Sequence, residues 1–299
     1  MTDRIQFAVN SWIFGTAPLE EVVPRVARIG FDAIELVGEP DQYDVTHVGR
    51  LVADHGLRIS SICGMHPGPT PGDLRLLSHP DAAERIRGID YVKRCVDMTA
   101  ALGARSVLVV PSLVGQPATL VSREDDIKVA TEALAVTGAY AQANDVLITI
   151  EPINRYEVGL IFSLADAIAM AEAVDNPCVR VMGDTFHMQI EEADGLPNAF
   201  RRAGGYWLQH VHVADNTRQA PGMGTMPWRE ILRALHDIDY QGLMSLEPLP
   251  RGASPYEARQ GRIPPAKQDA ELEFGLDFLR DSQEQALIAA GRRTVVETA

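Results

Sequence analysis

Short apolar runs and longer amphipathic stretches alternate along the whole chain. The apolar runs are continuous and rich in Val, Ile and Leu, as is typical of strands that are buried on both faces. They predict strands at residues 5–10, 33–38, 58–63, 105–111, 146–151, 179–184, 208–215 and 243–248. Helical spacing of apolar residues predicts helices at 19–30, 45–55, 82–102, 124–143, 163–173, 197–203, 228–237 and from 269 onward.

The strict alternation of eight strands with helices determines the expected fold class. Alternation implies parallel pairing of the strands, and eight such units in 299 residues fit a single α/β domain, a (β/α)8 TIM barrel. We expect the barrel to occupy about residues 5–280 of the domain 1–299, and a polar tail at about 281–299 to pack loosely. A doubly wound sheet is disfavoured because no strand leads into a GxGxxG turn.

Composition and charge narrow the class of protein. Lys and Arg total 27 against 41 Asp and Glu, a net charge of −14, which argues against nucleic-acid and membrane partners. The sequence has no apolar run of transmembrane length and no signal-peptide pattern at its start. Its cysteines, Cys63, Cys95 and Cys178, form no CxxC pair, so a reduced, cytoplasmic protein is expected.

Four acid or imidazole side chains fall at the ends of four consecutive predicted strands. They are Glu151, Asp184, His212 and Glu247. In a TIM barrel these strand ends meet at one rim, where catalytic groups lie. Each residue alone has an ordinary structural explanation, such as a helix cap for Asp184, but four such groups on one rim would repel one another without a cation. Three oxygen ligands and one nitrogen ligand suit one divalent cation, with Mn²⁺ preferred and Mg²⁺ or Co²⁺ as alternatives.

Other residues near the strand ends are candidates for contact with a ligand. Glu35 and His66 lie near the ends of strands two and three, and Trp12 follows strand one and is a candidate wall of the pocket. His210 shares a strand face with His212, so it should point into the barrel below the metal, where packing is its expected role.

Four long segments resemble those of a known family. They are 151–157 (EPINRYE), 183–192 (GDTFHMQIEE), 210–218 (HVHVADNTR) and 221–228 (PGMGTMPW). In sequence and spacing they are similar to the D-tagatose/D-allulose 3-epimerase group of the xylose-isomerase-like sugar isomerase/epimerase barrels. The resemblance covers the whole barrel in order and is strongest between residues 151 and 247.

This resemblance implies an activity. It implies that the four residues above hold the metal, that Glu151 and Glu247 also act as the acid/base pair, and that Glu157, His187 and Arg218 contact substrate hydroxyls. The implied enzyme is a divalent-metal-dependent keto-sugar epimerase or isomerase. It would abstract a proton next to a carbonyl through a metal-stabilised enediolate. The expected substrate is a small neutral sugar, and the expected assembly is a homo-oligomer.

The sequence departs from the family pattern at several positions, which leaves other functions open. The departures are at residues 64–68 (GMHPG), 110–112 (VPS) and 248–268, and at Asp215, where Glu is common. We expect these positions to surround the end of the substrate away from the metal. One alternative is therefore a lyase subunit of a hetero-oligomer, a C-glycoside deglycosidase acting on 3-oxo-glycosides with the same enolising site.

Two further alternatives are more remote. A phosphate-ester hydrolase like the apurinic endonucleases would need additional histidines at strands three and four. His66 could serve as one, but strand four ends at Val110 and Pro111. A non-catalytic sugar-binding barrel is disfavoured by the intact acid/base pair.

Overall fold

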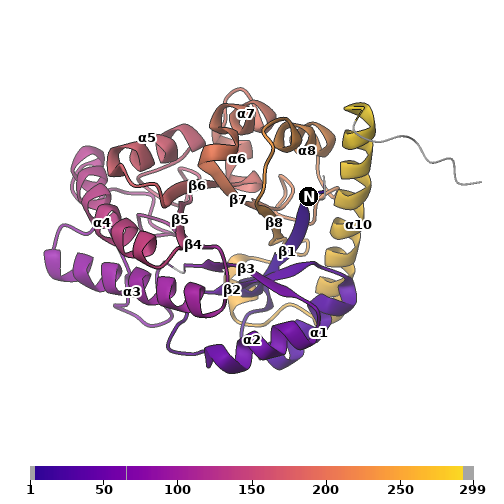
Figure 1. The fold of residues 1–299 in the computed structure, drawn as a ribbon, viewed down its shortest axis with the longest axis horizontal. Helices are drawn as coiled ribbons and strands as arrows, with labels where there is room; N and C mark the ends of the chain where they lie inside the picture. The colour runs from indigo at the N-terminus through magenta and orange to yellow at the C-terminus, as the bar shows by residue number, and fades with distance from the viewer. Residues whose placement is uncertain (1–3, 65, 292–299) are drawn as a thin grey trace, which may run out of the picture.

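The computed structural model describes residues 4–64 and 66–291, and within them the chain forms a closed barrel of eight parallel strands (Figure 1). The strands pair in the order of the sequence, and β1 closes the ring by pairing with β8. The (β/α)8 barrel predicted from the sequence is confirmed. The strands are β1 (Gln6–Asn10), β2 (Ala33–Val37), β3 (Arg58–Cys63), β4 (Ser106–Val109), β5 (Leu147–Ile150), β6 (Val179–Asp184), β7 (Leu208–Val213) and β8 (Leu243–Leu246).

Eight longer helices surround the ring of strands (Figure 1). They are α1 (Leu19–Ile29), α2 (Val45–Asp54), α3 (Ala82–Ala101), α4 (Arg123–Ala143), α5 (Leu164–Val174), α7 (Leu196–Trp207), α8 (Trp228–Asp237) and α10 (Pro265–Ala289). Side-chain oxygens of Asp44, Asp81, Ser122 and Ser163 cap the N-termini of α2, α3, α4 and α5.

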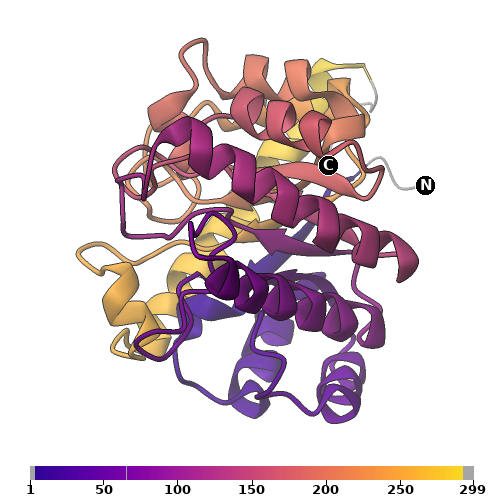
Figure 2. The ribbon, with the colours of Figure 1, turned by 90° about the vertical axis from the view of Figure 1, so that its left-hand side faces the viewer.

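Three short helices that the sequence did not predict follow the C-terminal ends of β1, β6 and β8. They are η1 (Ser11–Phe14), α6 (Thr185–Glu191) and α9 (Pro255–Arg259). In the side view, the yellow-orange segment that carries α9 protrudes at the left-hand end of the barrel (Figure 2), and α9 packs against η1. These short helices therefore build the rim to which the carboxyl ends of the strands point.

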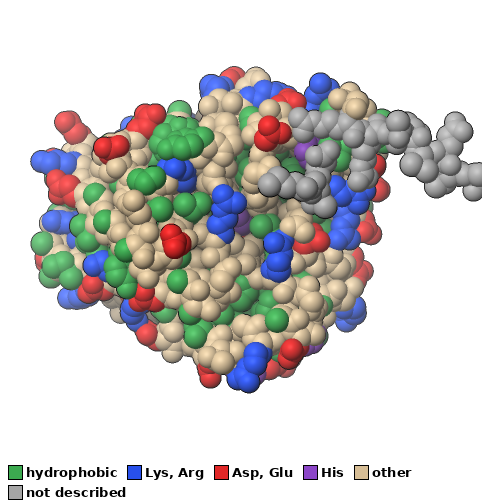
Figure 3. All heavy atoms as spheres, in the orientation of Figure 1, with side chains coloured by type: hydrophobic (Ala, Val, Ile, Leu, Met, Phe, Trp, Pro, Cys, Tyr) green, Lys and Arg blue, Asp and Glu red, His purple; other side chains and the backbone are tan. Residues whose placement is uncertain are grey.

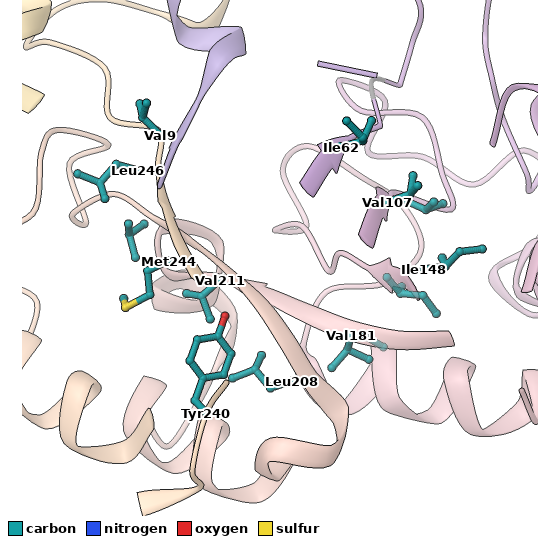
Figure 4. Packing of buried hydrophobic residues seen from close by; sticks show 14 of the residues in the cluster. Val9, Ile62, Val107, Ile148, Val181, Leu208, Val211, Tyr240, Met244 and Leu246 are labelled. Atoms are coloured by element: carbon teal, nitrogen blue, oxygen red, sulfur yellow. The ribbon is translucent and has the colours of Figure 1, made fainter. Parts of the chain in front are cut away.

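Successive side chains along each strand point alternately toward the surrounding helices and toward the barrel interior. Val211 and Val213 in β7 belong to the large apolar cluster, as do Met244 and Leu246 in β8. Figure 4 shows this packing, with Val211 beside its strand partner Met244. The residues between and after these apolar positions consequently face the inside of the barrel, which gives the polar groups of the motifs one common direction.

The end of the chain packs more tightly than the sequence suggested. The expected loose tail from residue 281 is wrong as far as Ala289, because α10 continues to that residue. Within this last part, Gln283 and Leu287 are buried. The Gln283 side chain accepts from the Ile5 backbone N–H at 2.6 Å and donates to the Ile5 carbonyl at 3.2 Å. The rest of the predicted tail, residues 292–299, lies outside the described residues.

The described helices include none that is long and apolar enough to span a membrane. Figure 3 views the molecule from the N-terminal ends of the strands, and acidic and basic side chains are interspersed over this face.

Candidate active site

Four inward-facing groups meet at the carboxyl ends of β5 to β8. Glu151 and Glu247 each follow the last residue of a strand, whereas Asp184 ends β6 and His212 lies within β7. All four side chains are buried. The alternation of the strands explains their direction. Ile150, Val211 and Leu246, each one residue before a site residue, face the helices, as does Val181, three residues before Asp184.

The distances place these groups around one small volume. His212 Nδ1 lies 3.7 Å from Glu151 Oε1 and 3.3 Å from Glu247 Oε2. Asp184, His212 and Glu247 each offer a potential metal-ligand atom, and these three atoms lie within 4.8 Å of one another. The same is true of Glu151, Asp184 and His187. Three carboxylates and one imidazole so close together and so deeply buried are consistent with a metal site.

Glu35 supports the imidazole of His212 from below. Its Oε2 lies 2.9 Å from His212 Nε2 and 3.2 Å from His210 Nε2, and Ser61 Oγ is 3.4 Å from that same His210 nitrogen. Burial raises the pKa of Glu35, but the two imidazoles outweigh burial and hold this pKa well below its usual range. A hydrogen bond from Nε2–H to Glu35 fixes the ring so that Nδ1 faces Glu151 and Glu247.

The structure agrees with the prediction for His210 but not with the one for Glu35. Glu35 was expected to be a candidate for substrate contact, and this is wrong, because the carboxylate is fully buried beneath the histidines. The alternation in β2 could have shown that Glu35 faces inward. His210 points into the barrel beneath the rim, as expected.

Arg218 supplies positive charge to the acidic group. Its Nη1 donates to Asp184 Oδ2 at 2.6 Å, and its Nη2 donates to Glu247 Oε1. Burial raises the pKa of Asp184, but Arg218 and then His187 outweigh burial and hold it below its usual range. Burial raises the pKa of Glu247 to about 8, against the opposing effects of Arg218 and His212. The two carboxylates therefore differ in their tendency to hold a proton.

The imidazole of His212 is strongly influenced by its acidic neighbours. Burial lowers the pKa of His212, but the carboxylates of Glu247 and Glu35 outweigh burial and raise this pKa well above its usual range. A metal ion bound at Nδ1 would displace a proton, so proton and metal compete for this atom.

His187 and Glu157 lie at the edge of the same acidic group. His187 Nε2 is 3.4 Å from Asp184 Oδ2, and its Nδ1 is 4.0 Å from Glu157 Oε1. Asn154 lies 2.7 Å from His187 Nδ1 and donates to Glu157 Oε1 at 3.1 Å. Asn154 thus holds together two residues for which the resemblance implied substrate contacts. The sequence analysis missed it, although it lies inside the 151–157 motif.

A cavity of about 490 Å³ opens above these groups. Its polar wall includes Glu151, Glu157, His187, His212, Arg218 and Glu247. Trp12 is also part of the wall, as expected, and its indole N–H donates to Glu247 Oε2 at 2.7 Å. His66 lines the cavity as well. The remaining wall is largely apolar and includes Leu108, Val110, Val114, Ile153 and Pro255.

Asp215 is not part of this cavity, contrary to its expected place near the far end of the substrate. Its carboxylate is fully buried and accepts from Gly222 N at 2.9 Å, Met226 N at 3.2 Å and Trp228 Nε1 at 2.8 Å. Asp215 therefore fixes the loop between β7 and α8. Trp228 begins α8 and is anchored by this bond.

Comparisons with known proteins agree with this arrangement. Residues 23–281 match the family described as the xylose isomerase-like TIM barrel. The chain is similar to a D-psicose 3-epimerase of Agrobacterium fabrum, with 31% identity over 76% of this chain and 78% of that protein. It is also similar to a 3-dehydro-D-guloside 4-epimerase of Escherichia coli, with 30% identity over 78% of this chain and 88% of that protein.

A solved structure of a D-psicose 3-epimerase in the presence of D-fructose superposes with a TM-score of 0.81. It covers 93% of this chain and 99% of its own, with 27% sequence identity. On the fold, the strand-end residues and these similarities, the chain belongs to the xylose isomerase-like TIM barrel family, and the relatives that it matches are sugar epimerases.

Proposed function

We propose that the protein is a divalent-metal-dependent ketose 3-epimerase, with Glu151, Asp184, His212 and Glu247 as the metal ligands. The observation that carries the proposal is the convergence of these four buried side chains around one volume. Buried carboxylates need compensating positive charge. Without a cation it comes from Arg218 and from protons held by His212 and Glu247, and a bound divalent cation would replace these protons. Hard oxygen donors with one imidazole fit Mn²⁺, Mg²⁺ or Co²⁺.

The chemistry requires removal of a proton from the carbon next to the ketone. A bound divalent cation would act as a Lewis acid, offsetting the negative charge that develops on the substrate oxygens. Glu151 on β5 and Glu247 on β8 reach the cavity from different strands. One carboxylate takes the proton from one face of the carbon, and the other acid returns a proton to the opposite face, which inverts the carbon.

The pKa of Glu247 supports its proposed role in proton transfer. A value of about 8 means that, near neutral pH and with no cation bound, Glu247 holds a proton readily, whereas a cation bound beside it would favour the carboxylate. Trp12 N–H and Arg218 orient its two oxygens. His187, Glu157 and Arg218 line the cavity, where they would bind substrate hydroxyls.

The direct test is product formation. The Mn²⁺-loaded protein is incubated with D-psicose and with D-fructose, and chromatography follows the appearance of the C3 epimer. We expect interconversion of the two sugars, and loss of this activity after chelation that added Mn²⁺ reverses. Full activity after exhaustive chelation would exclude the metal-dependent reaction.

The apolar part of the cavity wall favours a second candidate function, that of a lyase. A cavity of about 490 Å³, whose wall also includes Leu108, Val110, Val114 and Ile153, could hold a glycoside as well. On a C-glycoside oxidised at C3, loss of the C2 proton would break the bond from C1 to the aglycone, which leaves with the electron pair and is then protonated. Release of an aglycone from a 3-oxo-glycoside, together with a second subunit that co-purifies, would favour this lyase over the epimerase.

A further inference from the structure

His66 is a buried imidazole that the reaction described above does not use. It follows β3, and its side chain belongs to the wall of the cavity although the residue is only 5% exposed. In the closed barrel, β3 lies four strands away from β7, which carries His212. His66 therefore approaches the cavity from the side opposite His212.

The ring of His66 is held in one orientation. Its Nδ1 lies 2.7 Å from the Arg75 carbonyl oxygen, which can only accept a hydrogen bond, so Nδ1 carries the proton. The ring also meets Tyr91 edge-on, with centroids 5.5 Å apart. Arg75 is itself fixed by Glu39, at 2.8 and 2.9 Å, and by stacking on Tyr91. The orientation of the imidazole is therefore determined by its surroundings before any ligand binds.

The other nitrogen of the ring, Nε2, has no hydrogen-bond partner among the described residues. With the proton on Nδ1, Nε2 is an acceptor only. Gly64 packs closely beside the ring, because a Cβ there would lie 3.4 Å from Nε2 and 2.3 Å from the Leu108 carbonyl oxygen, so no side chain fits at this position. A buried acceptor without a partner costs about 1–3 kcal/mol, so a donor from a ligand fits here.

We propose that His66 Nε2 accepts a hydrogen bond from a hydroxyl group at the end of the substrate remote from the reacting carbon, and so acts as a specificity-determining residue. The inference rests on the proposed function. Burial lowers the pKa of His66 to about 4, so the imidazole stays neutral, and able to accept, near neutral pH. The neighbouring wall includes the apolar side chains of Val110, Val114 and Ile153.

The first test compares D-psicose with 6-deoxy-D-psicose, which lacks the terminal hydroxyl. We expect the Mn²⁺-loaded wild type to prefer D-psicose in kcat/KM by about tenfold or more. His66→Leu should bring this ratio close to one, and His66→Gln, which keeps an acceptor near the position of Nε2, should restore part of it. The control Val114→Ala, on the same wall, should change kcat/KM for both sugars by a similar factor.

The second test does not need turnover. In the Mg²⁺-loaded protein with ¹⁵N-labelled histidine, a hydrogen bond to Nε2 moves its resonance upfield, and we expect D-psicose to cause this shift where 6-deoxy-D-psicose does not. An Nε2 resonance that D-psicose leaves unmoved, or the wild-type ratio in His66→Leu, would overturn the role of His66. A shift without epimer formation would support His66 and contradict the proposed epimerase instead.

Discussion

Glu35 is the residue on which the orientation of His212 depends most directly. It accepts from two imidazoles through one oxygen and is fully buried beneath the rim. A carboxylate behind a metal-binding histidine fixes the ring and increases its basicity. Glu35 thus belongs to the candidate site although it does not line the cavity.

Replacement of this carboxylate should therefore weaken metal binding. We expect Glu35→Gln to lower the affinity for Mn²⁺ by about 10- to 100-fold, as measured by calorimetric titration of the metal-free protein. Glu39→Gln is the matched control, since Glu39 follows the same strand but pairs with Arg75. Equal affinities of Glu35→Gln and the wild type would show that His212 does not need this support.

His66 also predicts a dependence of stability on pH. Its pKa is about 4 in the folded protein, against about 6.5 when unfolded, because burial disfavours the charged ring. Below pH 6.5 the unfolded chain binds the proton first, so stability falls as pH decreases from 6.5 to 4, by about 3 kcal/mol for this group.

Urea denaturation between pH 7 and pH 4 measures this effect. Between these two pH values, the unfolding free energy of the wild type should fall by about 3 kcal/mol more than that of His66→Gln. Parallel pH profiles for the two proteins would mean that His66 is not buried in its neutral form.

The types of residue at the candidate site could be predicted from sequence, but their partners could not. Glu151, Asp184, His212 and Glu247 follow from strand ends and spacing, because a barrel brings consecutive strand ends to one rim. The contact of Glu35 with the histidines crosses from β2 to β7, and the turn that aims Arg218 has a positive φ of 61°. Neither feature has a local pattern in the sequence.

At the scale of elements, the long helices show helical spacing of apolar residues and the strands are continuous apolar runs, whereas the short rim helices have neither pattern. η1, α6 and α9 are too short for an amphipathic repeat to appear. Gly15, with a φ of 64°, ends η1 and approaches α9 so closely that a Cβ would lie 2.2 Å from the Ala258 carbonyl oxygen. Such contacts between distant segments decide where these helices form.

The end of α10 is predicted to stabilise the start of β1 through Gln283. Because its amide satisfies both backbone groups of Ile5, we expect Gln283→Ala to lower the unfolding free energy by about 1–3 kcal/mol. Gln285→Ala, at an exposed position two residues further along α10, should change it by less than about 0.5 kcal/mol. Urea denaturation distinguishes the two, and equal small effects would show that the Gln283 contacts add no stability.

For the molecule as a whole, the buried acidic group connects metal binding to stability. Among the described residues, Glu151, Asp184 and Glu247 bring three carboxylates together beside Arg218 and the imidazole of His212, whose Nδ1 would exchange a proton for the cation. A cation that binds only the folded state stabilises it, by about 2.7 kcal/mol at a free concentration 100 times its Kd.

Thermal unfolding with added Mn²⁺ and after chelation measures this coupling. We expect a higher midpoint with Mn²⁺ in the wild type, and a much smaller shift in Asp184→Asn, which has lost one proposed ligand. A midpoint that does not respond to Mn²⁺, Mg²⁺ or Co²⁺ would contradict the metal site.

The central claim is that Glu151 and Glu247 transfer protons to and from the carbon next to the ketone, and solvent deuterium incorporation at this carbon tests it most directly. In D₂O with D-psicose, Mn²⁺-loaded wild type should introduce deuterium at C3, as detected by mass spectrometry. Glu247→Gln, shown by circular dichroism to be folded and by elemental analysis to hold metal, should do so at least about 100-fold more slowly. Incorporation by this variant at the wild-type rate would contradict the account.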